Sequence, residues 1–221
     1  MKKRINYWQK LEEEGIYHVY NRSIGGEDLY ITDENFRFFL QRWDKYLGTY
    51  LEVLAYCLMP NHFHFMIKVK IIDEVLMEQV QKEGTIISVN FRNKEVEYND
   101  FLLDQFKRLF SSYSLSFNKQ YNRTGSLFQK RFKRIRLNTP SRVVEQLLYI
   151  HHNPIHHGFV GDYSLWKYSS YEAYFSKAST KLAKSTFNRI FEHEFDVSLI
   201  KAHENYKNKR RNERLDLDDF E

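Results

Sequence analysis

Two histidines, His62 and His64, stand one residue apart in a strand-like run over residues 62–70. Side chains two apart on a β-strand point to one face, so both imidazoles leave the same face while Phe63 enters the opposite, packed face. Imidazole is the commonest protein ligand of metal ions, and two imidazoles leave positions on a six-coordinate ion open for phosphate oxygens and water. The pair predicts a metal site, although the same pattern also arises by chance at a strand edge.

A tyrosine and an asparagine, Tyr149 and Asn153, stand four residues apart in a segment with helical spacing. Such side chains share one face of a helix, so a phenol and an amide oxygen would reach one site together. The phenol is a candidate nucleophile, and the amide oxygen is a third, hard metal ligand. The alternative is that both residues are structural: Tyr149 would be an interfacial aromatic residue, and Asn153 would merely end the helix before Pro154. Tyr113, on another helical segment, is the reserve nucleophile.

The types of ligand limit the choice of ion. Two imidazoles and an amide oxygen suit Mg²⁺ or Mn²⁺ better than a closed structural Zn²⁺ site. The single Cys57 cannot build a thiolate cage or an internal disulfide. His18 receives no metal role and is expected to pack or hydrogen-bond within the first strand. Another group of histidines is expected to satisfy carbonyl groups at a helix end or to contact phosphate, and comprises His151, His152, His156 and His157.

No Asp or Glu lies between Gln105 and Val144, in a chain of net charge +5. We call this stretch the basic belt, and its cations are Lys107, Arg108, Lys119, Arg123, Lys130, Arg131, Lys133, Arg134, Arg136 and Arg142. Aromatic residues interleave with these cations, which favours contact with a nucleic-acid backbone and stacking of bases. The alternative is a solvated basic face. The predicted DNA contacts from the belt are Arg123, Lys130, Arg131, Lys133, Arg134 and Arg136.

The elements that must position these residues follow from the periodicity of apolar side chains. The predicted order is strand 16–22, helix 33–47, strands 51–59 and 62–70, short helix 73–81, helix 101–121, strand 132–137 and helix 140–153. Residues 83–99 have no clear period and are interpreted as an insertion loop. Pro154 is expected to forbid much continuation of the last helix. This order predicts an α+β, ferredoxin-like (RRM-like) antiparallel sheet with helices on one face, the other face being open for a substrate.

Length and composition allow one domain with an appendage. The 221 residues, 42% of them hydrophobic, can fill one α/β core. We expect a catalytic domain over residues 1–175 and a C-terminal helical, charged tail over 176–221. No apolar run has the length of a signal peptide or a membrane span, so we expect a cytoplasmic protein that does not enter the membrane.

Five segments, in this order, resemble the REP-associated tyrosine transposases and, more broadly, the single-tyrosine HUH transposases of the insertion-sequence 200 and 605 class. They are 17–22 (YHVYNR), 58–64 (LMPNHFH), 125–133 (GSLFQKRFK), 148–154 (LYIHHNP) and 166–171 (WKYSSY). The resemblance implies that His62 and His64 bind the metal, that Asn153 completes its shell and that Tyr149 is the nucleophile. Asn21 and Arg22, in the first segment, join the predicted DNA contacts.

The resemblance also implies an activity. The chain would be a metal-dependent endonuclease and strand transferase that forms a 5′-phosphotyrosine intermediate on single-stranded DNA bearing hairpins or palindromic repeats, as in DNA transposition and recombination. One alternative is a non-catalytic ferredoxin-like protein that binds nucleic acid, and another is a metal-dependent nuclease that uses water. The sequence leaves open which DNA sequence is the target and whether the chain forms a homodimer. It also leaves open whether the chain mobilises its own element or acts on host repeats.

Overall fold

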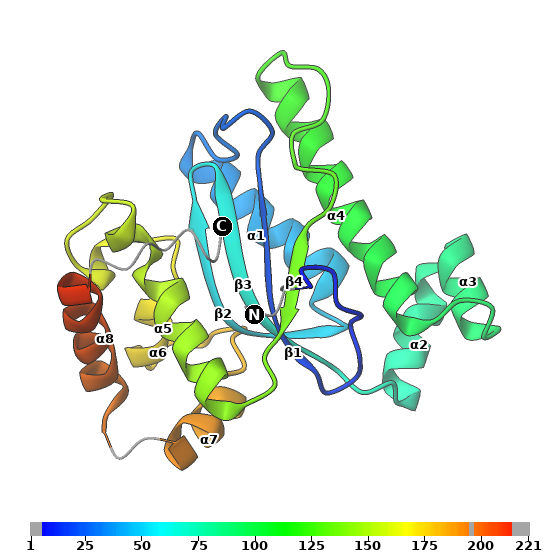
Figure 1. The fold of residues 1–221 in the computed structure, drawn as a ribbon. Coiled ribbons are helices and arrows are strands. Elements are labelled where there is room, and N and C mark those ends of the chain that lie inside the picture. The colour runs from blue at the N-terminus through cyan, green and yellow to red at the C-terminus, as the bar shows by residue number, and fades with distance from the viewer. Residues whose placement is uncertain (1–5, 195–196, 214–221) are drawn as a thin grey trace.

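A four-stranded antiparallel sheet lies at the centre of the computed structural model, which describes residues 6–194 and 197–213 (Figure 1). Its strands are β1 (Ile16–Arg22), β2 (Leu51–Met59), β3 (His62–Val69) and β4 (Lys133–Arg136). The strand order is β2-β3-β1-β4, with β1 and β3 in the middle. This order, together with the helices between the strands, confirms the predicted ferredoxin-like fold class.

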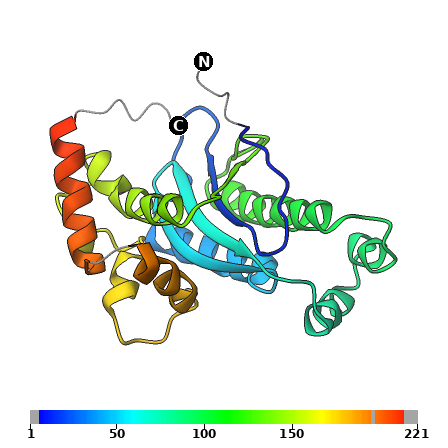
Figure 2. The same cartoon turned by 60° about the horizontal axis from the view of Figure 1, so that its bottom comes forward.

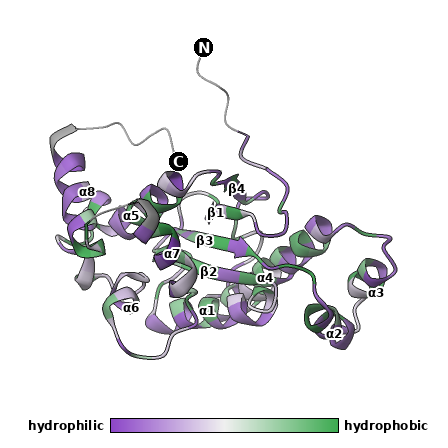
Figure 3. Cartoon of the chain, turned by 90° about the horizontal axis from the view of Figure 1, so that it is seen from below, coloured by the Kyte–Doolittle hydropathy of each residue, from purple (hydrophilic) through white to green (hydrophobic). Residues whose placement is uncertain are grey.

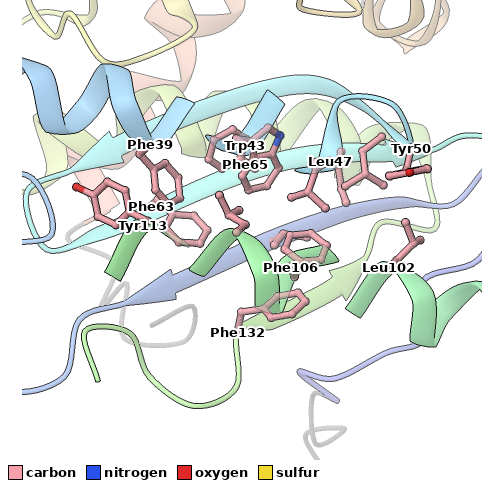
Figure 4. Packing of buried hydrophobic residues seen from close by; sticks show 14 of the residues in the cluster. Phe39, Trp43, Leu47, Tyr50, Phe63, Phe65, Leu102, Phe106, Tyr113 and Phe132 are labelled. Carbon is pink, nitrogen blue, oxygen red and sulfur yellow. The ribbon is translucent and has the colours of Figure 1, made fainter. Parts of the chain in front are cut away.

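Helices α1 (Asp33–Leu47) and α4 (Tyr98–Gln120) cover one face of the sheet. The alternation of β3 directs Phe63 and Phe65 into this layer, where Phe39 and Trp43 of α1 meet them (Figure 4). The rings of Trp43 and Phe65 stack with centroids 3.6 Å apart. Because the phenylalanines of β3 are committed to this core, the histidines between them are directed to the other face.

Helix α5 (Pro140–His156) crosses that other face and contacts β2 and β3. Val144 and Leu147 of α5 share a second apolar cluster with Leu54, Cys57 and Met66. The expectation of an open second face therefore holds only in part, since α5 covers the side formed by β2. The reason is the apolar character of the outward side chains of β2, which an open, solvated face would leave exposed to water.

The C-terminal helices pack on α5. Helix α7 (Lys184–Glu194) and helix α8 (Leu199–Glu213) follow a short 3-10 turn (Tyr163–Leu165) and helix α6 (Tyr171–Phe175). Figure 3 colours much of α8 as hydrophilic, yet its Ala202 and Tyr206 are buried in the cluster that contains α5. Among the described residues, no helix has the length and apolar character needed to cross a membrane.

The segment between β3 and α4 departs from the sequence-based expectation. Helix α2 (Glu74–Glu83) was expected, but residues 83–99 were interpreted as a loop and instead contain helix α3 (Ile86–Arg92). A capping box between Thr85 and Ser88 begins α3 and makes up for its weak apolar period. The two helices extend away from the sheet (Figure 2).

Helix α5 is longer than predicted and runs to His156, past Pro154. Pro154 has no N–H to donate, but the backbone N–H of His157 still donates to the carbonyl of Asn153 at 3.0 Å. The residues after Asn153 therefore keep helical geometry for part of a turn.

Candidate active site

The pairing of β1 with β3 gathers three histidines on the face that α5 crosses. In this register His64 lies opposite Tyr20 and His62 lies opposite Arg22. The rings of His62 and His64 have centroids 5.1 Å apart. Nε2 of His18, on β1, lies 2.9 Å from Nδ1 of His64. The i, i+2 spacing thus places both predicted metal-binding histidines side by side, with a third imidazole hydrogen-bonded to one of them.

Helix α5 brings Tyr149 and Asn153 to the same place. Thr139 caps this helix, its hydroxyl accepting the backbone N–H of Arg142 at 3.3 Å. The ring of Tyr149 meets that of His64 edge to face, with centroids 5.6 Å apart. Oδ1 of Asn153 lies 3.5 Å from Nε2 of His62. Four predicted site residues, from one strand and one helix, therefore lie together.

The amide of Asn153 has a defined orientation. Its Nδ2 donates to the carbonyl of Tyr149 at 3.3 Å, one turn earlier in the same helix. This contact directs the amide oxygen, rather than the nitrogen, toward His62. An oxygen in this position is a suitable ligand for a hard divalent cation.

A cavity of about 230 Å³ opens beside the two imidazoles. Its lining consists of Tyr20, Asn21, Arg22, Asn61, His62, His64, Gln129, Lys133, His157 and Phe159. Three predicted DNA contacts, Asn21, Arg22 and Lys133, are in this wall, so cationic groups and imidazoles face the same space. The described residues that line it do not include Tyr149 or Asn153.

Burial keeps His64 and His18 neutral. The side chain of His64 is 1% exposed, and burial lowers its pKa well below the usual value, with smaller contributions from His62, His18 and His157. The side chain of Asn153 acts on the pKa of His64 in the opposite direction. Burial also lowers the pKa of His18 to about 3. Neutral imidazole is the form that binds metal ions.

One nitrogen of each imidazole in the His18–His64 pair is left without a hydrogen-bond partner. Among the described residues, nothing accepts from or donates to Nε2 of His64 or Nδ1 of His18, and both atoms are buried. A buried polar atom without a partner costs about 1–3 kcal/mol. A metal ion on Nε2 of His64 would remove that cost, with Nδ1–H donating to His18 as metal-bound histidines usually do.

The donor set limits which ion fits. Within residues 6–194 and 197–213, no group of three or more His, Cys, Asp or Glu side chains has a metal-binding arrangement. The candidate ligands are therefore His62, His64 and the amide oxygen of Asn153. Such a set fits a hard, six-coordinate cation that keeps open positions, and it does not fit a closed structural zinc site.

His18 was expected to pack or hydrogen-bond within the first strand, and it does hydrogen-bond. Its partner, His64, could not be read from spacing, because the two residues lie 46 positions apart. The signal that could have found the contact is that His18 falls in the same outward register as Tyr20 on β1. The register of β1 on β3 then decides the pairing.

The predicted DNA contacts divide into three groups. Asn21, Arg22 and Lys133 line the cavity, and Lys130 and Arg131 are exposed outside it. The remaining arginines are engaged by protein groups, since Arg123 pairs with Glu27 and Arg136 pairs with Glu12. Nε of Arg134 donates to the carbonyl of Gln9 at 2.6 Å. These three arginines therefore hold parts of the chain together, which limits their availability to phosphate.

The histidines near the end of α5 correct a prediction. His151 and His152 are buried and do not satisfy the carbonyls of the helix end. His151 hydrogen-bonds with His203 of α8, and His152 with the hydroxyl of Tyr163. Only His156 and His157 are exposed at this end, and His157 lies 5.1 Å from His62 between ring centroids.

Comparisons with known proteins agree with the motifs. A Haemophilus influenzae protein, whose name places it among the REP-associated tyrosine transposases, is 26% identical over 122 residues, 54% of this chain and 58% of the relative. A solved structure of a REP-associated tyrosine transposase bound to a REP hairpin matches 80% of this chain and 87% of its own, with a TM-score of 0.55. At its 14% identity, that likeness shows the fold. No family model matches. Together these comparisons confirm the resemblance to the REP-associated tyrosine transposases.

Proposed function

We propose that the chain cuts and rejoins single-stranded DNA at sites associated with hairpins, through a covalent bond between DNA and Tyr149. One observation carries the proposal. The buried Nε2 of His64 has no partner among the described residues, and it lies beside His62, Asn153 and the ring of Tyr149. A metal-binding group and a candidate nucleophile thus share one place.

His62, His64 and Asn153 would hold a Mg²⁺ or Mn²⁺ ion, with the amide oxygen directed by the bond from Nδ2 to the carbonyl of Tyr149. When bound, such an ion withdraws charge from a phosphodiester and favours ionisation of a nearby phenol. Nε2 of His18 lies 2.9 Å from Nδ1 of His64, so His18 would accept from Nδ1–H of His64 and leave the lone pair of Nε2 available to the cation.

The cavity wall would position the scissile phosphate. Arg22 and Lys133 reach it from neighbouring strands and would offset the negative charge of the backbone. Nδ2 of Asn21 donates to the carbonyl of Gln129 at 3.1 Å and holds the segment before β4 in place. These contacts orient DNA by its backbone and do not select bases.

The chemical step transfers one phosphoester bond to the protein. The phenolic oxygen of Tyr149 attacks phosphorus, the bond from phosphorus to the 3′ oxygen breaks, and a 5′-phosphotyrosine and a 3′-hydroxyl result. The phenolic proton leaves to solvent, and the departing 3′ oxygen takes up a proton. Attack by a second 3′-hydroxyl reverses the step and joins strands without ATP. This reversibility makes the activity transposase-like rather than purely degradative.

Hairpin-bearing DNA is the proposed substrate because of the likeness to a transposase solved with a REP hairpin. The polarised charge of the basic belt independently favours a polyanion. A non-catalytic binding protein would share both features, but it would have no need for Tyr149 and Asn153 beside the imidazoles of His64 and His62.

The test is an incubation of a labelled hairpin-bearing single-stranded oligonucleotide with protein and Mg²⁺ or Mn²⁺, resolved on a denaturing gel. We expect a protein–DNA adduct that Tyr149→Phe abolishes, while folding and DNA binding persist. Tyr113→Phe is the matched control, because Tyr113 is buried and donates to the carbonyl of Leu29. Cleavage without an adduct would identify the water-using nuclease, and neither product would identify the binding protein.

A further inference from the structure

A second and larger cavity, of about 900 Å³, lies between α4 and the segment leading into β4. We call it the α4 groove. Residues 126–132 form one wall, residues of α4 form the other, and Trp8 stands at its edge. Arg134 lines this groove, whereas Lys133 lines the cavity beside the histidines. Adjacent residues of a strand point to opposite faces, so the two cavities lie on opposite sides of β4.

The α4 groove combines cations with exposed apolar side chains. Leu115 is 72% exposed and Trp8 is 47% exposed, so both present apolar surface at the groove. The exposed cations that line the groove are Lys107, Lys130 and Arg131, and Arg134 also lines it but donates to the carbonyl of Gln9. The guanidinium of Arg131 lies 5.9 Å from the centre of the Trp8 ring. No Asp or Glu stands among the described residues that line it.

This composition identifies the kind of ligand. An apolar protein partner would not need cations beside the apolar side chains, and a lipid surface would not need a walled groove with aromatic rings. Single-stranded nucleic acid needs both, since cations neutralise its backbone and aromatic rings stack on its bases. A duplex hides the faces of its bases, so the rings of Trp8 and Phe110 would gain little from it.

We propose that the α4 groove binds unpaired nucleotides of the DNA strand whose scissile phosphate lies in the cavity beside His62 and His64. The proposal rests on the proposed function and adds a second contact region to it. Gln129 lines both cavities, so one strand can pass from the groove, around the edge formed by β4, to the histidines. The groove would set which phosphate along an unpaired segment reaches Tyr149.

Equilibrium binding separates this proposal from catalysis. The protein is full-length Tyr149→Phe in the presence of EDTA, so that no adduct forms and no metal contributes. The probes are one labelled DNA hairpin carrying an unpaired extension of about ten nucleotides, within the range that single-strand binding sites cover, and the same hairpin with a blunt end.

Two double variants on α4 provide a matched comparison. Lys107→Glu with Leu115→Glu changes residues that line the groove, and Lys119→Glu with Ser116→Glu makes the same charge changes at exposed positions of the same helix outside the lining. We expect the groove variant to bind the extended hairpin about tenfold or more weakly than the control variant, the size of losing one or more stacked bases. Affinity for the blunt hairpin should be equal in both variants.

Equal affinity of the two variants for the extended hairpin would overturn the proposal. An equal loss on both probes would assign the groove to duplex DNA and overturn the claim for unpaired nucleotides. If the parent protein bound neither probe, the proposed function itself would fail. Thermal unfolding of both variants controls for folding.

Photocrosslinking gives a second, independent readout. The unpaired extension is substituted with 5-iododeoxyuridine, which reacts with aromatic side chains that lie against the base. We expect crosslinked peptides to contain Trp8 or Phe110. Crosslinks confined to Tyr20 or Phe159, which line the cavity beside His62 and His64, would contradict binding in the α4 groove.

Discussion

Two pairs of buried histidines differ in whether their outer ring nitrogens have hydrogen-bond partners. In the first, His18 and His64 bond to each other at 2.9 Å, and the outer nitrogen of each has no partner among the described residues. In the second, His151 and His203 also bond at 2.9 Å, but their outer nitrogens are satisfied. Nδ1 of His203 donates to the carbonyl of Leu199 at 2.8 Å, and Nε2 of His151 lies 2.8 Å from the hydroxyl of Ser170.

The second group determines its own tautomers. Since His203 donates from Nδ1, its Nε2 must accept from Nδ1–H of His151. Nε2 of His151 must then accept the one hydroxyl proton of Ser170 at 2.8 Å, in place of the longer 3.2 Å contact of that hydroxyl with the carbonyl of Tyr56. The chain is complete with every imidazole neutral. It links α5 to α8 and to the residues before α6, which is a structural role.

This difference in hydrogen bonding distinguishes the candidate metal site from a structural hydrogen-bond network. Burial lowers the pKa of histidines in both groups, so neither burial nor an altered pKa distinguishes them. What distinguishes them is that Nε2 of His64 has no hydrogen-bond partner among the described residues, whereas both ring nitrogens of His151 and of His203 have one. The same residue type is thus proposed to hold a metal in one region, and it joins two helices in the other.

The largest expected effect belongs to His64→Ala. Loss of a proposed direct ligand should reduce both Mn²⁺ affinity and adduct formation by about a hundredfold or more. Mutation of a residue that only supports a ligand already reduces metal affinity or activity by up to about a hundredfold. Mn²⁺ binding is measured by electron paramagnetic resonance, and adducts are measured on denaturing gels. Thermal unfolding in EDTA checks that the variant is folded. Adduct formation at the parent rate would remove His64 from the site.

His203→Ala should produce the reverse pattern. It leaves Nδ1 of His151 without its partner, so the free energy of unfolding should fall by about 2–3 kcal/mol. Adduct formation per folded molecule should be unchanged at a temperature where the variant is folded. Urea denaturation gives the first quantity, and the gel assay gives the second. A stable variant that forms no adduct would place the second histidine group in the catalytic apparatus.

His18→Ala should lower Mn²⁺ affinity about 10- to 100-fold, because His64 loses the acceptor that orients it. His18→Gln should recover part of the affinity, since an amide oxygen can accept from Nδ1–H of His64. Titration with Mn²⁺ measures all three proteins. Equal affinities would show that His18 only packs.

Acid should weaken the packing of α5 on α8 through the neutral histidines between these helices, which are His152 and the members of the second group. Burial lowers the pKa of His152 and of His203 to about 4, below the ordinary value of 6.5. Between these values the unfolded chain binds more protons than the folded one, so stability is lost as pH falls from about 6.5 toward about 4. Urea denaturation at pH 7 and pH 5 should show this loss, and His203→Ala should show a smaller one. Greater stability at pH 5 would contradict the account.

Much of the site could be predicted because its spacings are local. The alternation of β3 places His62 and His64 on one face, and one helical turn joins Tyr149 to Asn153. Periodicity also gave the strand and helix order, since α1 and α4 each bury one apolar face. These features depend on contacts within one element.

The features that sequence reasoning missed depend on contacts between distant elements. The partner of His18 follows from strand register, and the ion pair of Arg136 with Glu12 joins segments 124 residues apart. The crossing of α5 over β2 depends on apolar side chains from two elements that are each ambiguous alone. Helix α3 is too short for its period to stand out, and its capping residues were the available signal.

The most direct test of the central claim is to locate the covalent bond. Protein incubated with the hairpin oligonucleotide and Mn²⁺ is digested with trypsin and nuclease, and the peptide that carries residual nucleotide is sequenced by mass spectrometry. The account predicts a phosphodiester from the phenolic oxygen of Tyr149 to the 5′ end of a nucleotide. A nucleotide attached to any other residue, Tyr113 included, or cleaved DNA with no modified peptide, would contradict it.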